Sequence, residues 1–210
     1  MYKTQNIGII DYGMGNIKSV FNSLKYLGYK NLLLAKNPDD IAKSDLLILP
    51  GVGAFSDAMT NLNDKELIEP LNLHAIKNKK PTIGICLGMQ LFMDSSDEGI
   101  GAKGLGWIPG HVKKFEPNGS FKIPHMGWDN IKVTFNNDLF IGIPKDNHFY
   151  FVHSYYVDCD EKYSFAECDY GIRFSAAVSY NNLVAFQFHP EKSHTNGLKL
   201  LSNTIKKIST

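Results

Sequence analysis

The chain has 210 residues, of which 43% are hydrophobic and 20% are charged, and its formal net charge is +1 at pH 7. This length suits one well-filled α/β domain and is short for two. A charge near zero gives no basic footprint for nucleic acid or an anionic membrane, no apolar run is long enough to span a bilayer, and the N-terminus lacks a signal-peptide core. We therefore expect a soluble, cytoplasmic protein that binds neither nucleic acid nor membrane.

The first half of the chain alternates short apolar runs with helical patterns. Strands are expected at residues 7–10, 31–35, 45–50 and 81–85, and helices at residues 16–27, 38–44, 55–79 and 87–96. Pro70 should break the long third helix into two pieces, because proline has no backbone N–H. Short apolar strands that are separated by helices indicate a parallel sheet with helices on both faces.

The second half has a different pattern, in which residues 101–135 combine glycine, proline and aromatic residues with period-two fragments. One strong strand, the two strands of a β-hairpin and a last helix are expected, in that order, at residues 148–157, 175–180, 183–190 and 196–208. We therefore expect an α/β fold in a single domain over residues 1–210. Its three αβα layers should hold a central, mostly parallel sheet, with a smaller antiparallel β portion in the second half.

The stretch G-I-C-L-G around Cys86 joins an expected strand to an expected helix. Small residues on both sides allow the sharp turn that projects a nucleophile at the carboxyl end of a strand, as in the G-x-S-x-G turn of serine hydrolases. The start of the following helix would favour a thiolate. The pentapeptide alone leaves two interpretations open, which are a nucleophile and a buried cysteine that packs in a β–α turn.

Among the seven histidines, His189 is the strongest candidate for the base that a thiol nucleophile needs. It ends a hydrophobic strand in F-Q-F-H-P-E-K, where Pro190 stiffens the loop and Glu191 lies two residues further on. A carboxylate at this position suits an imidazole whose second ring nitrogen must be held. His153 is the next candidate, but it lies inside an expected strand with no local carboxylate.

An acyl-transfer thiol also needs N–H groups that bind the oxyanion. Leu87 and Gly88 offer such groups at the helix start, and the loop P-G-V-G, which contains Val52 and Gly53, should lie at the same edge of the sheet. The alternative for this loop is a tight β–α turn. The other two cysteines, in V-D-C-D-E and A-E-C-D-Y, lie beside acidic residues that would raise the pKa of a thiol, so they are poor nucleophiles.

The motifs G-I-C-L-G-M-Q and F-Q-F-H-P-E-K together resemble those of the class I, or triad, glutamine amidotransferases. The motifs I-I-D-Y-G-M-G-N, L-P-G-V-G-A-F, I-P-H-M-G-W-D and Y-F-V-H-S-Y resemble the histidine-biosynthesis branch of that family, and they occur in the expected order. The resemblance implies that Cys86 attacks the side-chain amide of glutamine, that His189 transfers protons and that Glu191 orients His189. It implies no cofactor and no metal.

The resemblance also implies a glutamine pocket. Gln90 and Glu98 would bind the substrate, and the backbone at Ser154-Tyr155 and at Gly53 would complete the pocket. Gln90 lies one helical turn beyond Cys86, so the two side chains share a face of the helix. Without the resemblance, Glu98 would be interpreted as a solvated acid after a helix.

Members of this branch pass ammonia to a cyclase subunit built as a (β/α)₈ barrel, so the resemblance implies a heterodimer. Positions that face the barrel in the family correspond here to Asn16, Trp128, Tyr150 and Lys192, although Trp128 could simply cover the core. Two alternatives stay open. One is a paralogous glutaminase that feeds another barrel synthase, for example in modified-sugar synthesis, and the other is a regulator or a different thiol hydrolase with the same fold.

Overall fold

The computed structural model describes residues 4–116, 121–134 and 138–209, so parts of the expected segments at 101–135 and 1–210 lie outside the described residues. Its main sheet has the order β2 (Leu32–Ala35), β1 (Ile7–Ile10), β3 (Leu46–Gly51), β4 (Thr82–Cys86), β14 (Leu183–Phe186), β13 (Arg173–Tyr180), β11 (Tyr155–Cys159), β7 (Gly110–Lys114), β5 (Ser95–Ser96) and β6 (Ala102–Lys103). The five strands from β2 to β14 are parallel. The sheet continues through β13, β11 and β7 as antiparallel pairs, and β12 (Ser164–Asp169) joins β13 to β9 (Lys132–Val133).

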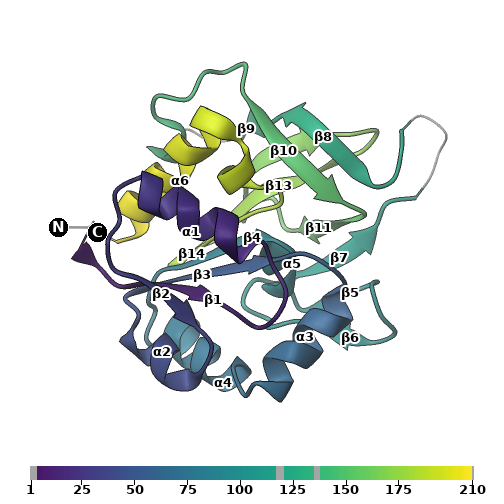
Figure 1. Cartoon of the computed structure of the whole chain (residues 1–210). Helices are drawn as coiled ribbons and strands as arrows, with labels where there is room; N and C mark the ends of the chain where they lie inside the picture. Colours follow the sequence, from purple (N-terminus) through teal and green to yellow (C-terminus); the bar gives the residue numbers. More distant parts are fainter. Residues whose placement is uncertain (1–3, 117–120, 135–137, 210) are drawn as a thin grey trace.

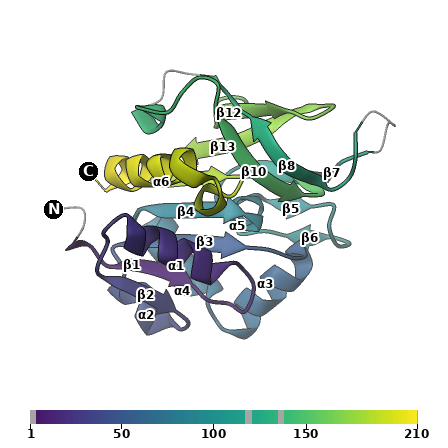
Figure 2. The ribbon, with the colours of Figure 1, turned by 45° about the horizontal axis from the view of Figure 1, so that its top comes forward.

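Helices cover both faces of the parallel part, as Figures 1 and 2 show. α1 (Ile17–Tyr26) and α6 (His194–Ile208) lie on one face, while α2 (Pro38–Lys43), α3 (Phe55–Asp64), α4 (Ile68–Asn72) and α5 (Leu87–Leu91) lie on the other. The alternation of side chains in β3 explains this arrangement, because Leu46 and Ile48 join the first core whereas Leu47 and Leu49 join the second. The expected three-layer αβα fold is confirmed. Within the described residues, no helix has both the length and the apolar character needed to cross a membrane.

The single strand expected at 148–157 is wrong, because the chain changes sheets at Ser154. β10 (His148–His153) pairs with β8 (His125–Asn130) in a separate two-stranded sheet, whereas β11 pairs with β7 in the main sheet. The side chains of Phe149 and Phe151 of β10 are buried in the core that lies between the sheet and helices α1 and α6. The crossover at Ser154 brings the end of β10 and the start of β11 next to the carboxyl end of β4.

The break in the expected helix at 55–79 lies at residues 65–67 rather than at Pro70. Glu66 adopts a positive φ of 56°, which ends α3. Pro70 is the third residue of α4, in the first turn of the helix, where a backbone N–H has no helical partner to lose. A π-helical turn (Leu73–Lys77) then continues from α4.

The helix expected at 87–96 is also too long, since α5 ends at Leu91 and residues 95–96 form β5. The backbone carbonyls of Leu91, Phe92 and Met93 accept hydrogen bonds from the segment at 105–107, which replaces further helical turns. Similarly, β14 ends at Phe186, so His189 lies in the connection after the strand rather than at its last residue. α6 begins two residues earlier than expected, at His194.

Candidate active site

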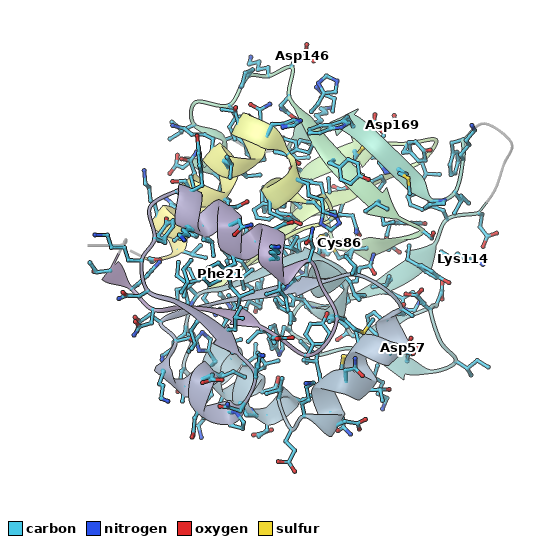
Figure 3. All side chains as sticks on the ribbon, viewed as in Figure 1. Phe21, Asp57, Cys86, Lys114, Asp146 and Asp169 are labelled. Atoms are coloured by element: carbon cyan, nitrogen blue, oxygen red, sulfur yellow. The ribbon has the colours of Figure 1, made fainter. Side chains whose placement is uncertain are left out.

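Cys86 occupies a strained turn between β4 and α5 at the carboxyl edge of the parallel sheet. Its φ and ψ are 55° and −111°, a conformation that a residue other than glycine rarely adopts. It is 6% exposed and lies opposite Gly51, the last residue of β3. Figure 3 shows Cys86 near the middle of the molecule, between the helical layers. Backbone strain of this kind is typical of a nucleophile turn, which favours the nucleophile interpretation over simple packing.

His189 and Glu191 form a buried pair next to this turn. Nδ1 of His189 lies 2.8 Å from Oε1 of Glu191, and each side chain is 1% exposed. Pro190 opens the 3₁₀ turn Pro190–Lys192 that brings the carboxylate back to the ring. A carboxylate accepts but does not donate, so Nδ1 carries the proton in this contact. Nε2 of His189 has no hydrogen-bond partner among the described residues, and it is therefore the nitrogen left for proton transfer.

The electrostatics of this pair favour a charged imidazole. Burial lowers the pKa of His189, but Cys86 and Glu191 raise it more strongly, to about 10 overall. The attraction to Cys86 favours the imidazolium form of His189, and an imidazolium beside a cysteine is the arrangement that activates a thiol nucleophile. The structure thus brings together the three residues that the sequence predicts for catalysis.

A pocket of about 400 Å³ opens over Cys86. The predicted site residues that line it are Val52, Gly53, Cys86, Leu87, Gln90, Glu98, Ser154 and Tyr155. Two further lining residues, Pro124 and Val152, were not predicted, and the last, His153, was predicted only as the second candidate for the base. Residues from five separate segments of the chain, at 52–53, 86–90, 98, 124 and 152–155, converge here, where the sequence predicts the glutamine pocket.

Gln90 is held in one orientation by its amide nitrogen. Its Nε2 donates to the carbonyl oxygen of Tyr155 at 2.9 Å and to Oε1 of Gln187 at 3.1 Å. Gln187 in turn donates to Sγ of Cys86 at 3.9 Å. Gln187 is a site residue that sequence reasoning missed, although it stands two positions before His189 in the same F-Q-F-H motif.

Glu98 is half-buried and not a freely solvated acid. Its Oε2 accepts a hydrogen bond of 2.8 Å from the backbone N–H of Phe55, at the start of α3. Burial raises the pKa of Glu98, the Phe55 N–H opposes this, and Asp57 adds to it. The Glu98 side chain is therefore fixed at the pocket by the Phe55 N–H, and its role in binding substrate stays a prediction.

The sequence model of the class-I glutamine amidotransferase family matches residues 8–208. The chain belongs to the class-I glutamine amidotransferases. The imidazole glycerol phosphate synthase subunit HisH 2 of Vibrio vulnificus is 47% identical over 195 residues, which are 93% of this chain and 91% of the relative. The subunit HisH 1 of Campylobacter jejuni is 46% identical over 95% of this chain and 99% of its own length. A crystal structure of a glutamine amidotransferase has a TM-score of 0.75 at 16% identity, covering 97% of this chain and 99% of that one, which shows the fold alone.

In this amidotransferase the predicted oxyanion groups lie on both sides of the nucleophile. Leu87 is the first residue of α5, directly after Cys86. Gly53 has a φ of 109°, which an L-residue with a side chain rarely adopts, and Val52 is 38% exposed at the pocket rim. Their role in binding an oxyanion stays a prediction.

Three of the four residues predicted to face a partner form one cluster beside His189. Trp128 lies 5.9 Å from Tyr150 between ring centroids, and Nζ of Lys192 lies 5.7 Å from the Tyr150 ring centre. The carbonyl oxygen of Tyr150 accepts the backbone N–H of His189 at 2.9 Å. Asn16 precedes α1 and its Oδ1 accepts a hydrogen bond from Ser19, while no side-chain hydrogen bond joins it to the cluster among the described residues.

Cys159 and Cys168 of the amidotransferase are free thiols with raised pKa values. Burial is the main cause in both cases, followed for Cys168 by Asp129 and Asp169. The expectation that they are poor nucleophiles agrees with these surroundings, but neighbouring acids contribute less than burial does. His153 is buried and is engaged by other residues, so it is not positioned as the base.

Glu191→Gln should slow glutamine hydrolysis by about 10²- to 10⁴-fold, because an amide no longer holds the His189 ring in the charged, correctly oriented form. Glu191 is one of the groups that raise the pKa of His189. Without it the imidazolium loses its proton at lower pH, so the alkaline limit of activity should move downward. The pH profile of kcat measures both effects. Glu161→Gln, at an exposed glutamate, is the matched control, and an unchanged profile in Glu191→Gln would contradict the role of Glu191.

Proposed function

We propose that this amidotransferase is the glutaminase subunit of an imidazole glycerol phosphate synthase, which supplies ammonia from glutamine for histidine biosynthesis. The observation that carries the catalytic part is the buried set of Cys86, His189 and Glu191 beside a pocket of about 400 Å³. The synthase assignment rests on near full-length identity of 46–47% to HisH subunits. A cytoplasmic location is part of the same proposal.

The geometry supports a thioester mechanism. The Cys86 thiolate attacks the δ-carbonyl carbon of glutamine, and the backbone N–H groups of Leu87 and Gly53 bind the oxyanion. The intermediate collapses, the C–N bond breaks, and His189 gives its proton to the leaving ammonia. Neutral His189 then takes a proton from water, whose hydroxide attacks the thioester, so glutamate leaves and the thiolate–imidazolium pair returns.

Substrate recognition follows from the fixed polar groups of the pocket. Because the N–H donors of Gln90 are used by Tyr155 and Gln187, the side-chain carbonyl oxygen of Gln90 is left as an acceptor for the substrate. Glu98 supplies a carboxylate that pairs with the α-ammonium group of glutamine. These roles require a substrate with both an ammonium group and a carboxamide, which glutamine has.

The proposed partner is a cyclase subunit with a (β/α)₈ barrel, joined in a heterodimer. The outer side of β8 exposes two large apolar residues, since Met126 is 61% and Trp128 is 43% exposed. Exposed apolar side chains next to a catalytic base are suited to a covered interface, and a central aromatic residue often anchors one. A partner seated here would receive ammonia at the edge of the sheet that carries Cys86.

The isolated chain should hydrolyse glutamine slowly, and the barrel cyclase with its nucleotide substrate should raise the rate by about 10²-fold or more, the effect of one oxyanion donor. The reason is the position of Val52 and Gly53, which lie at the pocket rim where a bound partner can reorient their peptide. Glutamate release with and without the cyclase and nucleotide tests this. A full rate in the isolated chain would be the contrary result.

A paralogous glutaminase for another barrel synthase is the alternative. It has the same active site, so only the partner separates the two functions. Expression in a bacterial strain that lacks its own glutaminase subunit of histidine biosynthesis tests this directly. Growth without added histidine is expected from our proposal, and failure to grow with a soluble, folded chain would favour the alternative.

A further inference from the structure

A chain of hydrogen bonds runs from Asp129 on β8 to the predicted glutamine pocket, and the mechanism above does not use it. Nε2 of His125 lies 2.7 Å from Oδ2 of Asp129, and Nδ1 of His125 lies 3.0 Å from Nε2 of His153. Nδ1 of His153 lies 2.8 Å from the carbonyl oxygen of Tyr155. The same oxygen accepts the Nε2 of Gln90 at 2.9 Å. The two histidines are paired across the small sheet formed by β8 and β10, which lie side by side in Figure 1.

Aromatic rings fix both imidazoles. His125 is stacked between Phe151, at 4.6 Å, and Tyr170, at 3.8 Å between ring centroids. Phe115, tilted at 5.4 Å, and Phe174, in a T-shaped contact at 5.2 Å between ring centroids, pack against His153. His125 is 1% and His153 is 6% exposed. Because bulk water scarcely reaches these rings, their nitrogens depend on each other and on the two ends of the chain for hydrogen bonds.

The number of protons in this chain follows from its hydrogen bonds. A carbonyl oxygen only accepts, so Nδ1 of His153 must donate to Tyr155. Burial and His125 lower the pKa of His153 to about 3, which keeps its ring neutral and leaves Nε2 as an acceptor. His125 must therefore donate from Nδ1. For its Nε2 to bond Asp129 as well, His125 needs a second ring proton.

Three bonds thus need three protons, whereas two neutral imidazoles and one carboxylate hold only two. The Asp129 side chain is 38% exposed and its contact atom is a carboxylate oxygen, which accepts, so we place the third proton on Nε2 of His125. We infer that Asp129, His125 and His153 form a positioning relay, with a protonated His125, that fixes Gln90 for the substrate through the Tyr155 carbonyl. This inference rests on the proposed function, because Gln90 matters to catalysis only if the pocket binds glutamine.

The extra proton makes the relay sensitive to pH. Burial lowers the pKa of His125 below its usual value, and the hydrogen bond and charge of Asp129 oppose this only in part, so the doubly protonated ring belongs to the acidic side of the pH range. The other titratable groups around the relay are His189 on the far side of His153, and Cys168, Asp169 and Tyr170 at the end of β12. As the pH rises and His125 loses its Nε2 proton, Nε2 and the Asp129 carboxylate are both acceptors, so the hydrogen bond between them is lost. Tyr155 and Gln90 are then held less firmly in position.

Asp129→Asn tests whether the second ring proton of His125 is needed when the hydrogen bonds of the relay are kept. An asparagine amide donates N–H to a neutral Nε2, so all three bonds are kept without the extra proton. Asp129→Ala removes the bond altogether. Asp169→Asn is the matched control, since Asp169 is an exposed carboxylate near the same rings and makes no hydrogen bond or ion pair with His125 among the described residues (Figure 3 labels it near the edge of the molecule).

The kinetic test uses the full chain with the barrel cyclase and nucleotide, and measures glutamate release against glutamine concentration at several pH values. Asp129→Ala should raise KM for glutamine by about tenfold, the effect of one lost hydrogen bond to a charged group, with a smaller change in kcat. Asp129→Asn should restore the wild-type KM and remove the rise of KM with increasing pH. Asp169→Asn should behave as wild type. An unchanged KM in Asp129→Ala, or equal pH profiles in wild type and Asp129→Asn, would overturn the inference.

Nitrogen-15 NMR of histidine-labelled chain gives a readout that does not depend on glutaminase activity. The wild type should show two ring protons on His125 over a pH range in which Asp129→Asn shows one, on Nδ1. A single ring proton on wild-type His125 at every pH at which the chain is folded would overturn the relay. If the chain shows the expected spectra but releases no glutamate with its partner, the proposed function fails while the proton assignment stands.

Discussion

Cys86→Ala is expected to abolish glutamine-dependent turnover, with a loss of about 10⁴-fold or more, while the proposed cyclase partner should keep its synthesis from added ammonia. No other thiol can replace this sulfur, because Cys86 is the one cysteine among the described residues that line the pocket. Alanine keeps the β-carbon and the β4–α5 turn, so the pocket should still bind glutamine. The expected result is therefore a loss of kcat in a chain that folds.

The experiment measures glutamate and imidazole glycerol phosphate formation in the reconstituted complex, first with glutamine and then with an ammonium salt. Cys159→Ala is the matched control, since Cys159 is a partly buried cysteine whose raised pKa makes it unreactive. It should retain glutamine-dependent activity. Glutamate production that persists in Cys86→Ala would exclude Cys86 as the nucleophile. Loss of the ammonia-dependent reaction as well would mean that the variant disrupts the complex rather than the chemistry.

The parts of the fold that sequence predicts well are those determined by local patterns. The run I-G-I-I forms β1 as expected, and the G-I-C-L-G turn forms at Cys86, because apolar runs and flanking glycines act within a few residues. The split of the strand at Ser154 has no such local signal. The alternation in H-F-Y-F-V-H-S-Y-Y-V continues across it, and only pairing with β8 on one side and β7 on the other decides where the chain changes sheets.

The residues of the candidate site likewise divide into those that a local motif identifies and those that only the folded structure brings together. Cys86, His189 and Glu191 are recognisable because each lies in a short motif, and the parallel sheet brings those motifs to one edge. Gln187 and the His125–His153 pair are not recognisable in this way. Their roles depend on bonds between residues far apart in the sequence, such as His125 to His153 and Gln187 to Gln90. Burial likewise explains the raised thiol pKa of Cys168 better than the adjacent acid that the sequence displays.

Gly88→Ala is expected to cost more than about 4 kcal/mol of the free energy of unfolding, the range reached by severe overpacking or strain in a core. A β-carbon at Gly88 would lie 1.8 Å from the carbonyl oxygen of Leu49 and 2.9 Å from its carbonyl carbon. Both are backbone atoms of β3, which is bonded to β1 and β4 on its two sides and cannot yield. Helix α5 would have to lift away from the sheet.

Because α5 begins directly after Cys86, the same displacement would move the nucleophile, Leu87 and Gln90 together. Since a typical domain has only about 5–15 kcal/mol of stability, most Gly88→Ala chains should be unfolded or aggregated, and urea denaturation followed by circular dichroism measures this. Gly101→Ala is the control, because nothing lies within 4 Å of its β-carbon and only its φ of 69° opposes the change, at about 1 kcal/mol. A Gly88→Ala chain with wild-type stability would show that the close contact between α5 and β3 is not what fixes the nucleophile turn.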